Sequence, residues 1–216
     1  MNPMQASLFA LVGAVGAWTF AGTRAAEPEP TNAIVAQTSG DSKDGKDAMA
    51  EMMKKAARYT QPGEEHKALE RLIGKWDTDA QFCMGSQTSP AGRGSLEFSW
   101  LMPGRWIQAR GAGTFMGMPA DQFHVIGYDR FKMSYVSTHV TNLDTAMVRL
   151  EGDMTPDGKA LLMYGTLDEY LTGENDKMIK YVWRFVSADK IVLEVHDLPI
   201  GEVGTKVVEI TMTRAK

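Results

Sequence analysis

The chain has 216 residues, of which 44% are hydrophobic and 23% are charged, a composition typical of a globular protein with one principal core. Its formal net charge is −4 and it contains no basic run of the kind that neutralises phosphates, so we expect no nucleic-acid partner. Cys83 is the single cysteine, which excludes an internal disulfide and a zinc site built from several thiolates.

The amino terminus has the pattern of an export signal. Residues 8–21 are apolar but form too short a stretch to span a bilayer comfortably, and mostly small residues, with Arg24 among them, follow as far as Ala26. We therefore predict a signal peptide over residues 1–25 and a periplasmic or secreted protein. No cysteine follows the apolar stretch, which argues against a lipid anchor, so an uncleaved leader would be the only membrane contact.

Two segments separate the leader from the predicted domain. Residues 26–46 are rich in proline, serine, glycine and charge, and we expect a disordered linker because they offer little to bury. Residues 47–59 follow as an amphipathic helix capped by Asp47, with Met49, Met52 and Met53 on one face. A methionine stripe of this kind is typical of packing against a domain or a partner.

A short helix leads directly into the first strand of the domain, which we predict over residues 60–216. In TQPGEEHKALERLIGKWD, residues 60–77, Pro62 suits the first helical turn and Gly74 suits the C-terminal stop. Apolar side chains then alternate from Trp76 to Phe82, which is the period of a strand. The junction therefore predicts a helix of about three turns followed by β-structure.

The alternation continues through most of the remaining chain. Apolar side chains fall on one face in the stretches 94–100, 181–185, 191–195 and 208–214, and turn-forming residues separate these stretches. We therefore predict a mainly β fold, an antiparallel barrel of about ten strands, because closure removes the edges of so long a sheet. The short helix is expected at one end of this barrel.

Gly74, Trp76 and Arg214 mark the two ends of the predicted barrel sequence. A short helix leading into Gly-x-Trp on the first strand, with an arginine near the end of the last strand, resembles the lipocalin and fatty-acid-binding (calycin) superfamily. The resemblance implies that the indole packs at the closed end of the barrel beneath the guanidinium. The alternation independently turns both side chains inward, so the role expected for these residues is structural closure.

Four longer stretches of the sequence resemble one particular family. The chain is similar to a bacterial family known as domain of unknown function 1579, over roughly residues 61–216, in PGEEHKALERLIGKWD, IGYDRFKMSYVSTHVTN, LEGDMTPDGKALLMYGT and VVEITMTRAK. Because that family has no assigned activity, the resemblance implies a fold and no particular function.

Inward-facing aromatic residues suggest a ligand cavity. The leading hypothesis is a module that binds a small apolar or amphipathic ligand inside the barrel. Its candidate wall residues are Phe82, Leu96, Phe98, Trp100, Tyr135, His139, Tyr181, Trp183 and Phe185. In the rival hypothesis these side chains fill the lumen, and a structural or interaction protein of the cell envelope acts through its outer surface or its N-terminal helix.

Four histidines give the remaining chemical signals. Their spacing fits no zinc finger or metalloprotease, and the chain has no nucleophile elbow or phosphate loop, so we expect no metal site and assign no catalytic residue. His66 and Glu70 are expected to cap or pair on the short helix. Alternation leaves the orientation of His124 and His139 open, and it turns His196 outward. A third hypothesis, a haem or nitric-oxide-handling barrel resembling nitrobindin, needs an inward histidine; otherwise no cofactor is expected.

Overall fold

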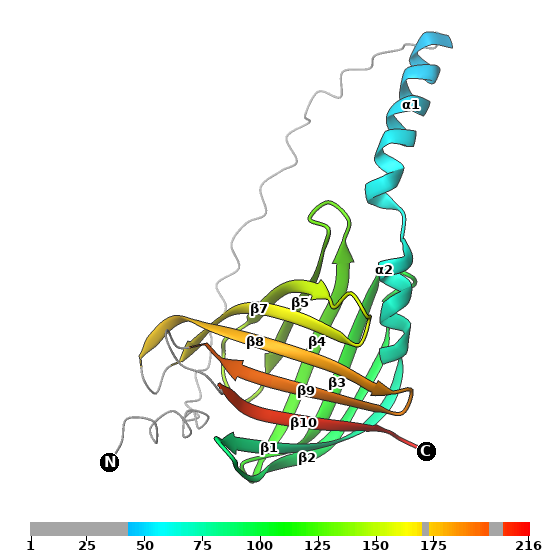
Figure 1. Cartoon of the computed structure of the whole chain (residues 1–216). Helices are drawn as coiled ribbons and strands as arrows, with labels where there is room; N and C mark the ends of the chain where they lie inside the picture. The colour runs from blue at the N-terminus through cyan, green and yellow to red at the C-terminus, as the bar shows by residue number, and fades with distance from the viewer. Residues whose placement is uncertain (1–42, 170–172, 199–204) are drawn as a thin grey trace, which may run out of the picture. The chain divides into compact units, whose positions relative to one another are not determined.

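The structure, a computed structural model, describes residues 43–169, 173–198 and 205–216 (Figure 1). The predicted signal peptide over residues 1–25 and most of the predicted linker over residues 26–46 lie outside the described residues. The chain divides after Thr60 into two compact units, with helix α1 in one and the barrel in the other, and we describe each by itself.

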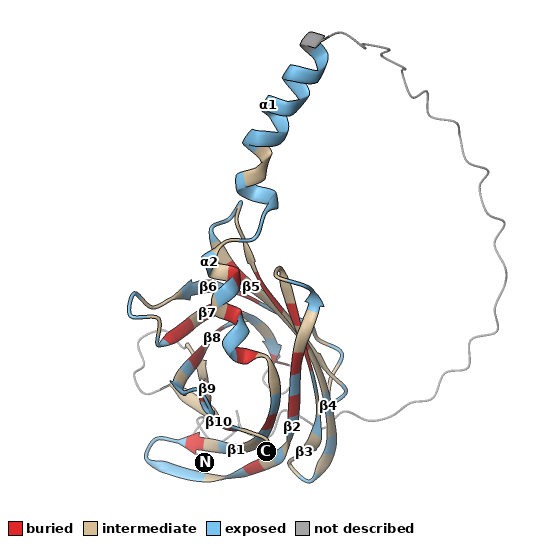
Figure 2. Ribbon diagram, turned by 90° about the vertical axis from the view of Figure 1, so that its right-hand side faces the viewer, coloured by how far each residue is buried: buried red, intermediate tan, exposed pale blue. Residues whose placement is uncertain are grey.

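Helix α1 spans Lys43–Thr60, so it begins before Asp47, the start predicted from the sequence. Figure 2 shows that α1 is exposed along most of its length. Its methionines are open to solvent in the structure: Met49 is 55% exposed, Met52 56% and Met53 63%. Within the described ranges, no helix combines the length and the apolarity that crossing a membrane requires.

Ten antiparallel strands form one closed barrel, as the alternating sequence predicts (Figure 1). Each strand pairs with its neighbours in the chain, and β1 pairs with β10 to close the sheet. The strands are β1 (Gly74–Met84), β2 (Gln87–Met102), β3 (Trp106–Phe115), β4 (Met118–Asp129), β5 (Ser134–Thr141), β6 (Val148–Met154), β7 (Ala160–Glu169), β8 (Glu174–Ser187), β9 (Lys190–Asp197) and β10 (Lys206–Arg214).

The short helix predicted before β1 is present, but most of it is wound more tightly than expected. Helix α2 spans Glu64–Lys67, and the 3₁₀ helix η2 continues over Ala68–Leu72. The tighter winding of η2 keeps Leu69 and Leu72 buried, at 1% exposure each, while the flanking charged side chains stay in solvent. Both leucines pack into the barrel core.

Hydrogen bonds fix α2 and η2 across one end of the barrel. The Tyr135 hydroxyl on β5 donates to the backbone carbonyl of Glu65 at 3.0 Å. Arg71 Nη1 donates to the carbonyl of Gly158, in the β6–β7 turn, at 2.7 Å. Because α2 and η2 bridge strands on separate parts of the barrel wall, they cover the opening at this end of the barrel. We call this end the closed end.

Trp76 and Arg214 join the first and last strands at the closed end. The indole is fully buried, and its Nε1–H donates to the carbonyl of Leu72 at 2.8 Å. The guanidinium of Arg214 lies 4.2 Å from the ring centroid and donates to the carbonyl of Ile73. Gly74 has a φ of 124°, and a Cβ there would lie 2.6 Å from Arg214 Nη1, so this junction requires glycine.

Apolar side chains fill the half of the barrel next to the closed end. The Phe98 and Trp183 rings meet edge to face, with centroids 6.2 Å apart. The main members of this packed half, each at most 4% exposed, are Trp76, Leu96, Phe98, Tyr135, Leu161, Met163, Trp183, Ile191 and Met212. This half is therefore a packed hydrophobic core.

Candidate functional site

The other half of the barrel is lined by inward side chains that remain partly accessible. The strand register determines which residues face inward, because alternate residues share a face and so do directly paired residues on neighbouring strands. Toward the end opposite α2, the half-buried inward residues are Phe82, Phe115, Gln122, Ser137, His139, Tyr181, Val195, Val208 and Ile210. These inward side chains keep part of their surface accessible at this end of the barrel, and we call this region the open half.

Two histidines meet inside the open half. The register pairs His124 on β4 with His139 on β5. Their imidazole rings stack with centroids 4.8 Å apart and planes 16° apart. His124 is 5% exposed, and its Nε2 lies 3.1 Å from Gln122 Oε1, which accepts the hydrogen bond. Both histidines therefore point into the lumen, which settles the orientation that alternation alone leaves open.

Burial keeps both imidazoles neutral. Burial, reinforced by the neighbouring His139, lowers the pKa of His124 from 6.5 to about 3. Burial likewise lowers the pKa of His139 to about 4. A neutral imidazole has one donor and one acceptor nitrogen, so the pair offers hydrogen bonds without presenting a charge.

Tyr181 adds a second polar group to the same side of the open half. Its ring on β8 lies 5.9 Å from that of His139. Burial raises the pKa of its hydroxyl, with a contribution from Asp144, so the group stays protonated. Within the part of the chain that the structure describes, no group hydrogen-bonds the Tyr181 hydroxyl or the His139 ring nitrogens. These inward polar groups are therefore available to bond water or a bound molecule.

The wall on β1, β3 and β10 is apolar. The Phe82 and Phe115 rings meet edge to face, with centroids 5.4 Å apart. Val208 and Ile210 continue this surface along β10 and are half-buried. The open half therefore combines an apolar wall with a short polar surface, the usual composition of a small-molecule site.

Three charged side chains form an ion cluster across β7, β8 and β9. Lys177 Nζ lies 2.6 Å from Glu169 Oε2 and 2.7 Å from Asp197 Oδ2. Burial alone would lower the pKa of Lys177, but its hydrogen bonds to Asp197 and Glu169 outweigh that effect and raise it. Because the lysine is held by both carboxylates, we interpret the cluster as a tie between the three strands.

The residues predicted to line a cavity lie in three places. The open half is bordered by Phe82, His139 and Tyr181. The packed half contains Leu96, Phe98, Tyr135 and Trp183. The closed end holds Trp100, beside α2, and Phe185, whose ring lies 4.5 Å from the Arg71 guanidinium carbon.

Among the open-half residues that were not predicted as wall residues, Phe115 and Gln122 lie on strands whose inward face the sequence did not indicate. Both follow a stretch in which glycine and alanine replace the large side chains that make alternation visible, residues 109–113. The available sequence signal was Gly117, which is typical of a tight turn; the structure places such a turn between β3 and β4, with positive φ at Met116 and Gly117. Counting back from that turn would have indicated which face each residue occupies.

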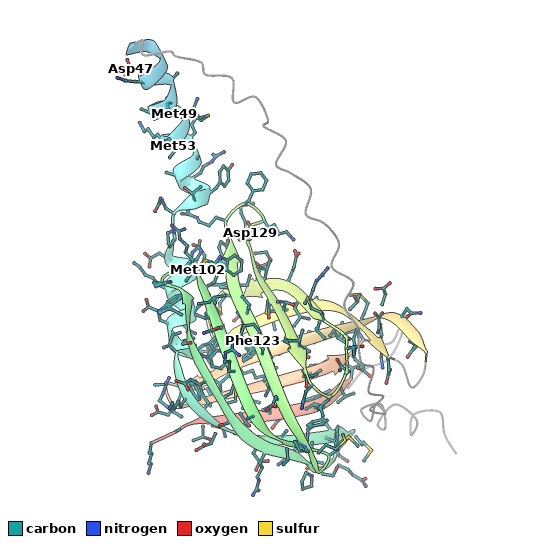
Figure 3. The ribbon with its side chains drawn as sticks, turned by 180° about the vertical axis from the view of Figure 1, so that it is seen from behind. Asp47, Met49, Met53, Met102, Phe123 and Asp129 are labelled. Atoms are coloured by element: carbon teal, nitrogen blue, oxygen red, sulfur yellow. The ribbon has the colours of Figure 1, made fainter. Side chains whose placement is uncertain are left out.

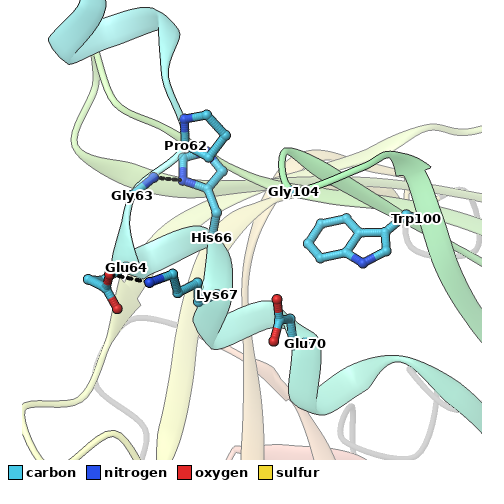
Figure 4. A pocket seen from close by; sticks show the side chains of 8 residues that line it. All are labelled: Pro62, Gly63, Glu64, His66, Lys67, Glu70, Trp100 and Gly104. Atoms are coloured by element: carbon cyan, nitrogen blue, oxygen red, sulfur yellow. Dashed lines mark hydrogen bonds and ion pairs between the residues drawn. The ribbon is translucent and has the colours of Figure 1, made fainter.

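A separate cleft of about 310 Å³ lies beside α2 (Figure 4). It is lined by Pro62, Gly63, Glu64, His66, Lys67, Glu70, Trp100 and Gly104. The Gly63 N–H donates to His66 Nδ1 at 3.0 Å, so His66 caps the helix, and Lys67 pairs with Glu64 at 2.6 Å. Over the described residues, no three histidine, cysteine, aspartate or glutamate side chains gather closely enough to hold a metal ion.

Comparisons with known proteins agree with the fold. Residues 61–214 match the model of a family described as a protein of unknown function, DUF1579. No curated protein matches the chain. The crystal structure of Rv2717c from M. tuberculosis is similar, with a TM-score of 0.50, 10% identity, and coverage of 72% of this chain and 100% of that chain.

Two further solved structures are similar at lower scores. One is the S-type phycobiliprotein lyase CPES from Guillardia theta, with a TM-score of 0.46, 12% identity, and coverage of 74% of this chain and 96% of that chain. The other is a redesigned β-barrel, mFAP1, bound to DFHBI, with a TM-score of 0.34, 16% identity, and coverage of 68% and 98%. At these identities the similarities concern the fold alone.

Proposed function

This chain belongs to the DUF1579 family, and we propose that it binds a small, uncharged amphipathic molecule in the open half of its barrel. The observation that carries the proposal is the presence of unpartnered polar groups, the Tyr181 hydroxyl and the His139 imidazole, beside accessible lumen surface. We propose that this takes place in the periplasm or outside the cell, because residues 1–25 have the pattern of a signal peptide.

The chemistry of the open half favours an uncharged ligand. His124, His139 and Tyr181 are all neutral near pH 7, because their pKa values are shifted away from neutrality by burial. An anionic group would find no counter-charge among these three side chains, would lie near the carboxylate of Asp144, and would carry a large desolvation cost. A ligand with an apolar ring or chain against Phe82 and Phe115, and one hydrogen-bonding group toward Tyr181, meets both surfaces.

We also infer a calycin relationship for the barrel. The support is the arrangement of Gly74, Trp76 and Arg214, which matches the closed-end pattern of that superfamily. In this interpretation the closed end stabilises the barrel, and the opposite half provides the space for a ligand.

Titration with a neutral fluorescent probe, N-phenyl-1-naphthylamine, tests the proposal. We expect one probe per chain, with enhanced probe emission. Tyr181→Phe keeps the ring and removes the hydroxyl, so the affinity should fall about fivefold to tenfold, the equivalent of one lost hydrogen bond of about 1 to 1.5 kcal/mol. Tyr164→Phe is the matched control, because Tyr164 lies on the outer face of β7 and is 45% exposed.

Two outcomes of this titration would contradict the proposal. If Tyr164→Phe and Tyr181→Phe weakened binding equally, the probe would be held on the outer surface. If the wild-type protein bound neither the probe nor any molecule from its own compartment, as judged by native mass spectrometry, the structural or interaction hypothesis would be preferred.

A haem-binding barrel is a second candidate function, and one observation favours it over the expectation from sequence. That hypothesis needs an inward histidine, and both His124 and His139 face the lumen as neutral imidazoles, the form that ligates iron. Haem should then bind with a sharp Soret shift that His139→Ala abolishes. An unshifted, broad Soret band would eliminate this candidate and leave the neutral-ligand proposal unaffected.

A further inference from the structure

Helix α1 carries a continuous apolar stripe that is exposed. Met49, Met52, Met53, Ala56 and Tyr59 recur at spacings of three and four residues, so they lie on one side of the helix. The methionines and Tyr59 range from 39% to 63% exposed, and Figure 3 shows Met49 and Met53 projecting from the helix. So much exposed apolar surface on one side of a helix indicates a binding face.

The net charge of α1 is opposite in sign to the net charge of the whole chain. The helix contains five lysine or arginine residues and three acidic residues, a net charge of +2, in a chain whose net charge is −4. From Met52 to Thr60 the charged residues are Lys54, Lys55 and Arg58, with no acidic residue. The segment that carries the apolar stripe is therefore also locally basic.

We propose that α1 is an interfacial helix that lies on an anionic lipid surface, with its methionine stripe in the headgroup boundary and Lys46 and Lys55, which flank the stripe, against the lipid charges. An amphipathic helix with an apolar stripe and basic flanks has the composition that such surfaces bind. The only membrane contact expected from the sequence is an uncleaved leader, so α1 would be an additional membrane-binding surface.

A second copy of the chain fits the same stripe less well. Pairing two helices along Met49, Met52, Ala56 and Tyr59 would place residues at positions 46, 53, 55 and 60 beside the seam. The charged residues among them are Lys46 and Lys55, both basic, so these positions offer no acidic residue that could pair with them across the seam. An anionic surface instead neutralises them.

Vesicle flotation of the full chain tests this proposal. We expect binding to vesicles of mixed phosphatidylglycerol and phosphatidylcholine, and much weaker binding to phosphatidylcholine alone. Replacing both Lys46 and Lys55, the cations that flank the stripe, by glutamine should weaken binding about 30-fold, from about 1 kcal/mol per cation near the surface. Met52→Gln, which preserves length and helix propensity, should weaken it about tenfold.

Matched controls come from the barrel surface. Met147→Gln changes a methionine that is 54% exposed, and the double change Lys159→Gln with Lys190→Gln removes two exposed lysines. Both controls should bind like the wild type. Equal binding to neutral and anionic vesicles, or equal losses in the control and α1 variants, would overturn the proposal. Concentration-dependent dimers that Met52→Gln abolishes, without vesicle binding, would also overturn it and assign the stripe to a second copy.

Discussion

Replacing Trp76 by alanine is expected to lower the free energy of unfolding by about 3–5 kcal/mol, the usual cost of removing a large aromatic side chain from a core. The indole is fully buried and packs between the first and last strands. Its removal also leaves the Leu72 carbonyl without its donor and the Arg214 guanidinium without the ring beneath it. Urea denaturation measured by circular dichroism gives the change directly.

Arg214→Ala should be destabilising by less, because Arg214 is only half-buried and water can replace part of its bonding. Phe131→Ala serves as a control for the loss of an aromatic ring, since Phe131 is 77% exposed and should change stability by less than about 0.5 kcal/mol. An unchanged denaturation midpoint for Trp76→Ala would refute the closed-end arrangement.

The barrel could be predicted because its signals are local. Leu96, Phe98 and Trp100 alternate within one strand, and closure follows from the absence of long helical crossovers between many such strands. The junction at Gly74 was equally readable, because a glycine after a short helix and before a tryptophan marks the start of β1. Predicting the barrel and this junction does not require knowing which strands are neighbours.

The candidate site could not be predicted in the same way, because it depends on register. Around His124 and His139, both faces of the strand carry apolar and polar residues, so alternation has no preferred direction. Only the chain of pairings from Trp76 through β2 and β3 to β4 shows that both rings face inward. The division into a packed half and an open half likewise depends on how side chains from different strands fill the same space.

Acidification should destabilise the folded barrel between about pH 6.5 and pH 4. His124 and His139 have pKa values lowered to about 3 and about 4, whereas in the unfolded chain both titrate near 6.5. In this window the unfolded state binds more protons, so the free energy of unfolding falls as pH falls. The slope is about 1.4 kcal/mol per pH unit for each histidine, or about 3–4 kcal/mol for the pair by pH 5.

The double variant His124→Gln with His139→Gln removes both proton-linked groups and should flatten this part of the stability profile. His66 and His196 also have pKa values lowered chiefly by burial, so a smaller slope will remain. His196→Gln is the matched control, because His196 lies on the outer face of β9 beside Glu194 and is only part-buried. Urea midpoints at intervals from pH 7 to pH 5 measure the slope. Equal slopes in the wild type and the double variant would mean that the lumen histidines are not protected from protonation, and the neutral lining on which the ligand proposal depends would be lost.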